Sequence, residues 1–178
     1  MRIISGKYKG RRIKAPKKLP VRPTTDMAKE ALFNILNNSY YFDDLEVLDL
    51  FAGSGNISYE FASRAAKNVV SVDADFGCVK FISTTAKELQ LTIDVIKSDV
   101  FKYLEKTVSK FDIVFADPPY DMAIEKLSEI VALTFDRQLL QTDGLLILEH
   151  SKHTDLSQLD HFTNKRKYGG SVFSFFEA

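Results

Sequence analysis

From residue 45 onward, the chain alternates between short apolar runs and stretches in which apolar residues recur every three or four positions. Near-continuous apolar runs are typical of strands that are buried on both faces of a parallel sheet. The stretches between them have the period of a helix with one buried face. The pattern predicts strands at residues 46–51, 68–73, 92–99, 111–117 and 144–150, and helices at residues 56–66, 75–89, 100–106 and 122–133.

Both ends of the chain depart from this alternation. Residues 161–177 indicate two strands joined by a Gly169–Gly170 turn, so at least one strand of the sheet is expected to be antiparallel. Near the N-terminus, apolar residues at positions 28, 31, 32 and 35 predict a helix that Thr25 caps. Repeated β-α units of this kind predict an α/β fold with helices on both faces of the sheet.

The first 24 residues form a segment of different character. The stretches "RII" and "RRIK" flank "SGKYKG", whose glycines permit turns, so a β-hairpin is expected there. Pro16, Pro20 and Pro23 then favour an extended connection. We therefore expect a hairpin and arm at residues 1–24, followed by one compact domain at residues 25–178.

Charge separates these two parts. Nine of the 24 Lys and Arg residues lie within the first 25 residues, which contain no Asp or Glu. The rest of the chain therefore carries 15 bases against 24 acids, although the net charge of the whole is zero. A basic arm on an acidic domain favours a polyanionic partner such as nucleic acid, and a solvated basic tail is the alternative.

Composition sets broader limits. A chain of 178 residues with 45% hydrophobic and 27% charged residues is typical of one soluble globular domain. No apolar run is long enough for a bilayer, and the start lacks the apolar core of a signal peptide. The single Cys78 fits a reducing cytoplasm. Glu149, His150 and His153 lie close together, but their spacing matches no common metal site, so no metal is expected.

A glycine turn follows the first strand of the alternating region, in "DLFAGSGN" at Asp49–Asn56. Gly53 and Gly55 permit a tight turn and a close approach to a ligand, and the next helix offers free N–H groups. Ser58 stands where a dinucleotide-binding fingerprint has its third glycine. The motif alone therefore leaves a purely structural turn as the alternative.

Three acids strengthen the prediction of a ligand site. Asp49, Asp73 and Asp99 are expected at the carboxyl ends of successive strands, the edge where ligands bind in open α/β sheets. Asp73 could accept ribose hydroxyls, while Asp99 could accept an adenine amine and Val100 pack on its ring. Three carboxylates without a P-loop lysine disfavour a polyphosphate. They favour an adenosine ligand with positive charge, namely S-adenosylmethionine.

The stretch "FADPPYD" predicts the other half of a transfer site. Pro118 and Pro119 have no N–H group and hold Asp117 extended, so this corner presents acceptors with few competing donors. Tyr120 adds a flat face for stacking. Such a corner is complementary to the exocyclic amine of a nucleobase, which it could orient for attack on the sulfonium methyl group. A simple strand-ending turn is the alternative.

In combination, "VLDLFAGSGNISYE", "VDAD", "KSDV" and "ADPPY" resemble the Rossmann-like, class I S-adenosylmethionine-dependent amino-methyltransferases. "MRIISGKYKGRRIKAP" and "RPTTDMAKEALFNIL" narrow the resemblance to the bacterial RsmD family, which methylates N2 of a guanine in 16S ribosomal RNA. The resemblance implies a seven-stranded, mostly parallel sheet with an antiparallel last strand. It also implies a cytoplasmic, monomeric enzyme whose substrate is a partly assembled small ribosomal subunit.

Residue roles follow from the same resemblance. Catalysis would fall to Asp117, Pro118, Pro119 and Tyr120. The cofactor would be held by Asp49, Phe51, Ala52, Gly53, Ser54, Gly55, Asn56, Asp73, Ala74, Asp99 and Val100. RNA would be contacted by Lys7, Lys9, Arg11, Arg12, Arg22 and Thr24. The family often has Glu at the position of Asp73 and Arg at that of Lys29, and the second difference leaves any fork-like contact of Lys29 open.

Two other functions compete with this interpretation. A DNA amino-methyltransferase could use the same crevice, but such enzymes usually need a recognition region for which this chain has no room. A non-catalytic RNA-binding assembly factor could keep the fold without the chemistry, although the intact Asp49, Gly53, Gly55 and Asp117 argue against it. The sequence does not choose the nucleotide that is modified.

Overall fold

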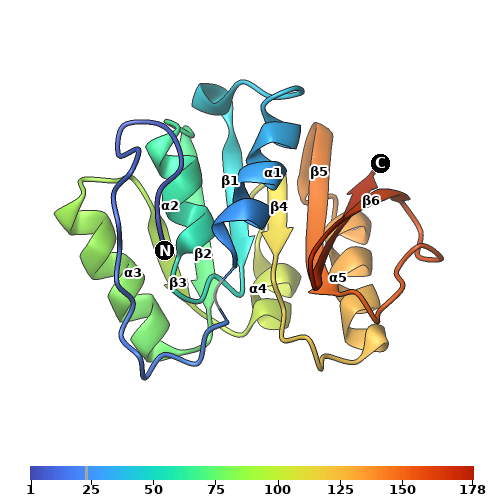
Figure 1. The fold of residues 1–178 in the computed structure, drawn as a ribbon. Helices are drawn as coiled ribbons and strands as arrows, with labels where there is room; N and C mark the ends of the chain where they lie inside the picture. Colours follow the sequence, from blue (N-terminus) through green and yellow to red (C-terminus); the bar gives the residue numbers. More distant parts are fainter. Residues whose placement is uncertain (23) are drawn as a thin grey trace.

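A seven-stranded sheet runs through the centre of the protein, with the strand order β3-β2-β1-β4-β5-β7-β6 (Figure 1). The computed structural model describes residues 1–22 and 24–178, so Pro23 of the expected extended connection lies outside the described residues. The strands are β1 (Glu46–Leu50), β2 (Asn68–Asp73), β3 (Asp94–Lys97), β4 (Phe111–Ala116), β5 (Leu140–Ser151), β6 (Phe162–Tyr168) and β7 (Ser171–Glu177).

Helices cover both faces of the sheet, as the alternating pattern predicts. One face packs against α1 (Asp26–Leu36) and α2 (Asn56–Ser63), and the other against α4 (Val100–Lys106) and α5 (Ile124–Asp136). A further helix, α3 (Phe76–Glu88), follows β2, and a 3₁₀ turn occupies Phe42–Asp44. Among the described residues, no helix is long and apolar enough to cross a membrane.

Every predicted strand and helix of the alternating region is confirmed, with differences at the boundaries. Strand β3 is four residues long instead of the predicted eight, because it lies at the sheet edge and pairs only with β2. Strand β5 begins at Leu140, since a register shift beside β4 lets the residues before the apolar run continue the pairing. Helix α1 begins after Thr25, whose hydroxyl accepts from the Ala28 N–H at 3.2 Å.

The connections confirm the predicted fold class, a Rossmann-like α/β sheet with an antiparallel last strand. Strands β1 to β5 pair in parallel, whereas β7 is antiparallel to both β5 and β6. The strand order reverses between β1 and β4, which are direct neighbours. The carboxyl ends of these two strands therefore meet at the switch point where α/β proteins bind ligands.

The N-terminal arm lies across α2 and α3 (Figure 1), where Ile3 and Ile13 are buried in a cluster with Tyr59 and Ile82. Within the arm, Arg2 and Arg12 form one isolated antiparallel bridge, so the expected hairpin is present without two regular strands.

One glycine of the arm explains how closely it docks. Gly6 has φ +81°, and a Cβ atom there would lie 1.8 Å from the Ser63 carbonyl oxygen. The Lys7 N–H donates to that same oxygen at 2.8 Å. The arm is thus fixed to the end of α2 by backbone contacts that only glycine permits.

Candidate active site

A cavity of about 390 Å³ opens at the carboxyl ends of β1, β2 and β4, within the size range of small-molecule sites. The segment before α1 forms its fourth wall. The cavity is lined by Pro20, Val21, Arg22, Thr24, Asp49, Phe51, Ala52, Gly53, Ser54, Asn56, Ile57, Asp73, Phe115, Asp117, Pro118, Pro119 and Tyr120. Both predicted halves, the glycine turn and the proline corner, therefore face one space.

Four residues expected to hold the cofactor do not line this cavity. Gly55 instead packs against the core, since a Cβ atom at this left-handed position would lie 2.8 Å from the Tyr59 ring. Asp99 caps α4 by accepting from the Lys102 N–H at 3.0 Å, and Val100 is buried beneath the same helix. Ala74 is exposed. Their expected cofactor contacts stay predictions.

Asp49 is fully enclosed beneath the glycine turn. Ser58, the residue that replaces the third glycine, donates to the Asp49 carboxylate through its N–H at 3.1 Å and its hydroxyl at 2.5 Å. Burial raises the pKa of Asp49 to about 7, against the lowering effect of the Ser58 hydrogen bonds. The departure from the dinucleotide fingerprint thus supplies donors to a buried acid beside the cavity.

Asp73 holds the glycine turn in place. Its carboxylate accepts from the Gly53 N–H and from the Asp75 N–H, both at 2.8 Å. Phe51 and Gly53 both have φ +56°, a left-handed conformation that is unfavourable for a bulky side chain. Asp73 therefore ties the strained turn to the end of β2 and still borders the cavity.

The proline corner contains a cluster of charges. The Arg22 guanidinium lies 2.7 Å from the Asp117 carboxylate and 3.7 Å from Glu149, and its carbon lies 3.2 Å from the centre of the Tyr120 ring. Burial and the neighbouring Glu149 raise the pKa of Asp117 well above its usual value, whereas Arg22 lowers it. The corner therefore binds a planar cation in this structure.

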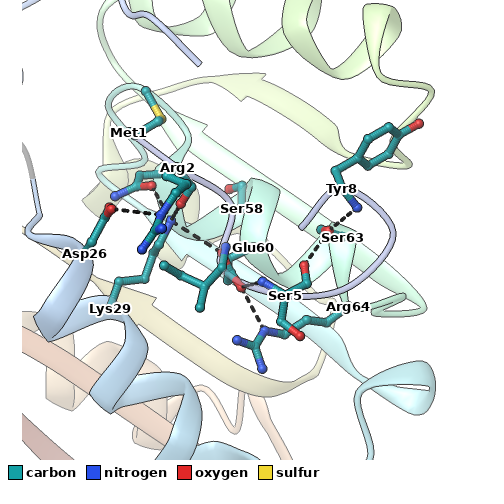
Figure 2. A network of polar contacts seen from close by, with 12 residues as sticks. Met1, Arg2, Ser5, Tyr8, Asp26, Lys29, Ser58, Glu60, Ser63 and Arg64 are labelled. Carbon is teal, nitrogen blue, oxygen red and sulfur yellow. Dashed lines mark hydrogen bonds and ion pairs between the residues drawn. The ribbon is translucent and has the colours of Figure 1, made fainter. Parts of the chain in front are cut away.

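A buried ion pair joins the arm to the cofactor side of the site (Figure 2). The Lys29 ammonium donates to the Arg2 carbonyl at 2.5 Å and to the Asn56 side chain at 2.8 Å, and it lies 3.4 Å from Glu60. Lys29 and Glu60 are both fully buried. Three acceptors surround the three N–H donors of one ammonium, so this position does not depend on the planar fork of an arginine.

Glu60 completes the link by accepting from the backbone of the arm. Its two carboxylate oxygens accept from the Ile4 N–H at 2.8 Å and the Ser5 N–H at 3.0 Å, and Arg64 lies 2.9 Å away (Figure 2). Helix α1, helix α2 and the arm are therefore joined by a single polar network.

The expected RNA-binding residues fall into two groups. Lys7, Lys9, Arg11 and Arg12 are exposed on the docked arm, whereas Arg22 and Thr24 line the cavity. The sequence pattern predicts no role for Pro20, Val21, Ile57 or Phe115, which also line it.

Glu149 stands out in the sequence only beside the two histidines of a rejected metal site, yet it lies next to Asp117. Its position could have been inferred from the predicted sheet, because the strands that end near Asp117 and Glu149 are neighbours. Among the described residues there is no group of three or more His, Cys, Asp or Glu that could hold a metal.

Known proteins are similar to this chain in both sequence and fold. Residues 1–177 match the family described as "Conserved hypothetical protein 95". The ribosomal RNA small subunit methyltransferase D of Escherichia coli is 31% identical over 150 residues, or 84% of this chain and 74% of that protein. A hypothetical protein of Thermus thermophilus has a TM-score of 0.87 at 29% identity, with 100% of this chain and 99% of that chain covered.

A more distant structure shares the fold with a ligand present. The 16S rRNA N2 methyltransferase RsmC of Thermus thermophilus, in complex with AdoMet and guanosine, has a TM-score of 0.70 at 21% identity. The likeness covers 89% of this chain and 45% of that chain. At this level of identity it shows the fold, and the sequence matches decide the family. From the family match and the identity to the E. coli protein, the chain belongs to the RsmD family.

Proposed function

We propose that this protein transfers a methyl group from S-adenosylmethionine to N2 of a guanine in 16S ribosomal RNA, within an assembled or partly assembled small subunit. The observation that carries the proposal is that the Asp117–Tyr120 corner and the glycine turn line one cavity at the β1/β4 switch point. The named activity of the E. coli relative supports the choice of substrate.

The residues around the glycine turn suit a cationic adenosine cofactor. Asp49, Asp73 and Asp117 all border the cavity, whose lining includes no lysine among the described residues. Burial holds the pKa of Asp49 near neutrality, so a nearby positive charge would stabilise its ionised form. Asp49 and the turn would hold the methionine part, and Asp73 the ribose. When bound, S-adenosylmethionine supplies the electrophilic methyl group.

The proline corner would prepare the target amine. Asp117 and a backbone carbonyl of the corner accept the two N–H bonds of the guanine amine, while Tyr120 stacks on the base. These contacts hold the nitrogen with its lone pair facing the cofactor side. The methyl group would pass from the sulfonium sulfur to this nitrogen, so that the N–C bond forms, the S–C bond breaks and the thioether is the leaving group. Asp117 would accept the proton that the nitrogen loses. Its raised pKa makes the ionised carboxylate a stronger base than an exposed Asp.

The arm would make most of the contacts with RNA, and the target base would rotate out of its RNA loop into the cavity. The exposed Lys and Arg side chains of the arm present positive charge on the α2–α3 side of the domain, while Arg22 and Thr24 lie at the cavity. We assign the enzyme to the cytoplasm as a monomer that acts on ribosomal subunits.

A single assay tests the proposed function. Labelled S-adenosylmethionine is offered with small subunits, naked 16S RNA and duplex DNA, and the labelled nucleoside is identified after digestion. We expect N2-methylguanosine from the RNA substrates, with small subunits preferred. Label found only in N6-methyladenine of DNA would contradict the proposal, and cofactor binding without any transfer would favour the assembly factor.

The arm should set the salt dependence of RNA binding. Replacing Lys7, Lys9, Arg11 and Arg12 by glutamine should weaken binding and reduce the slope of log K against log salt by up to about 3, because fewer counterions are released. The matched control replaces Lys102, Lys106, Lys110 and Lys126, exposed bases near α4 and α5. An unchanged slope for the arm variant would rule out the arm as the main contact.

Cofactor affinity should depend on the ionisation of Asp49. Its pKa is about 7 in the cofactor-free protein, so binding a cation below that pH requires loss of a proton. Affinity should therefore fall roughly tenfold from pH 7.5 to pH 6. Asp49→Asn should bind more weakly but with little pH dependence, as measured by calorimetry. A wild-type affinity that stays constant over this range would exclude Asp49 as the titrating group.

A further inference from the structure

Arg22 occupies the position where the target base is expected. Its guanidinium lies over the Tyr120 ring, with the central carbon 3.2 Å from the ring centre. The same group donates to Asp117 at 2.7 Å and lies 3.7 Å from Glu149. The corner thus holds a planar cation over the ring, with one terminal nitrogen, Nη2, near both carboxylates.

Glu149 brings the second carboxylate to this position through strand register. Ala116 of β4 pairs with Leu148 of β5, so the next residues, Asp117 and Glu149, are neighbours at the same sheet edge. The Glu149 side chain is 1% exposed. The sheet itself therefore fixes the spacing of the two acids.

One oxygen of Glu149 lacks a partner. Oε1 accepts from Ser171 at 3.0 Å and from Tyr120 at 3.3 Å. Oε2 is buried and accepts no hydrogen bond from any described residue. Leaving a buried carboxylate oxygen unpaired is unfavourable. Oε1 is the oxygen that lies 3.7 Å from Arg22, so a donor in this corner meets Glu149 at Oε1.

Guanine carries the same arrangement of donors as the arginine side chain. Its C2 atom is bonded to N1, N2 and N3, as the central carbon of a guanidine group is bonded to three nitrogens, and N1–H and one N2–H point along one edge. Adenine has an amine next to an unprotonated ring nitrogen, which would face a carboxylate with no hydrogen between them. Two adjacent carboxylates therefore fit guanine and oppose adenine.

We propose that Glu149 determines base specificity by accepting a hydrogen bond from guanine N1–H while Asp117 accepts one from N2–H. In the absence of RNA, Arg22 occupies the same binding site until the base displaces it. The inference rests on the proposed function. The Arg22 side chain is 39% exposed, so it can leave the corner toward solvent. It is then available to an RNA phosphate, consistent with its expected RNA contact.

Glu149 must remain an acceptor for this role. Burial raises its pKa, whereas the Ser171 hydroxyl, the Arg22 charge and the Tyr120 hydroxyl lower it. The two hydroxyl donors remain after Arg22 departs, and the bound cofactor would bring a positive charge to the adjoining part of the cavity. A higher assay pH favours the ionised carboxylate.

The test removes the N1 proton of the base, together with the O6 carbonyl, and keeps the amine that is methylated. An RNA that the enzyme methylates is prepared with 2-aminopurine at the target, which keeps the amine on C2 but has an unprotonated N1. The wild type should prefer guanine by at least about 100-fold in kcat/KM, because 2-aminopurine would place an unprotonated N1 against the Glu149 carboxylate. Glu149→Gln should reduce this preference at least tenfold, since its amide can either accept or donate.

Two controls separate specificity from folding and from the proposed function. Glu129→Gln, a partly exposed position on α5, should keep the wild-type preference. Equal wild-type rates on both RNAs, or an unchanged preference in Glu149→Gln, would overturn the inference while leaving methylation of guanine intact.

A binding experiment decides the inference even if no RNA is methylated, the outcome that counts against the proposed function. With Arg22→Ala and bound cofactor, guanosine should bind at least tenfold tighter than 2-aminopurine riboside, as followed by ligand NMR. Millimolar guanidinium should compete with guanosine and not with the cofactor. Equal binding of the two nucleosides, or no competition by guanidinium, would overturn the inference.

Discussion

Asp117→Ala should lower kcat by roughly 10³-fold while S-adenosylmethionine binding is largely kept. The substitution removes both the acceptor that orients the amine and the group that takes its proton, each of which acts on the transition state. The glycine turn, by contrast, is held by Asp73 and not by Asp117. Single-turnover methyl transfer and cofactor calorimetry measure the two effects separately.

Asp117→Ala should not reduce the stability of the folded state. The pKa of Asp117 is raised in the folded protein, so its ionised form is less favourable there than in the unfolded chain. Such a group reduces the stability of the folded state once the pH rises above the pKa that the group has in the unfolded chain. Removing it should therefore leave the unfolding free energy at neutral pH unchanged or higher. A lower unfolding temperature would therefore point to a structural role for Asp117.

Gly53→Ala provides the complementary variant. Gly53 has φ +56°, and a Cβ atom there would lie 3.1 Å from Val21. This change should weaken cofactor binding first, because it disturbs the turn that Asp73 holds. If Asp117→Ala loses as much cofactor affinity as Gly53→Ala, the proposed division of roles is wrong.

The sequence predicted those features that depend on local pattern. The glycine turn and the proline corner face one cavity because strands β1 and β4 are neighbours, which the β-α alternation implies. Hydrophobic period also located every helix and strand of the alternating region. The physical reason is that buried faces repeat at fixed intervals along the chain.

Features that depend on side-chain direction could not be predicted in this way. Asp99 was expected to end its strand, but β3 ends at Lys97 and Asp99 caps α4, outside the cavity lining. In the sequence, Ser58 replaces the third glycine of a dinucleotide-binding fingerprint. In the structure, its hydroxyl donates a hydrogen bond to buried Asp49. Glu149 gained meaning only when register placed it beside Asp117. Each case needs three-dimensional neighbours that lie far apart in sequence.

Lys29→Met should destabilise the protein by about 3 kcal/mol, because removing one partner of a buried ion pair leaves the other charge uncompensated. Lys29 and Glu60 are both fully buried. The expected cost lies at the lower end of the usual range because Arg64 still lies 2.9 Å from Glu60. Urea denaturation measures the change in unfolding free energy.

The same substitution at the surface serves as the matched control. Lys67 pairs with Glu46 at 3.0 Å, but its side chain is 64% exposed. Lys67→Met should change stability very little, because solvent screens an exposed pair. Similar effects of the two substitutions would show that burial of Lys29 adds nothing to its contribution.

A double substitution separates the charge from the contacts. Glu60 accepts from the Ile4 and Ser5 N–H groups, so replacing it by an apolar residue would leave two backbone donors unpaired. Glu60→Gln keeps an acceptor for the arm and removes the charge. Added to Lys29→Met, it should recover part of the lost stability, with a coupling energy of about 1 kcal/mol or more. Strict additivity of the two changes would mean that the charges of Lys29 and Glu60 do not stabilise each other, and that the arm is held by its hydrogen bonds and apolar contacts instead.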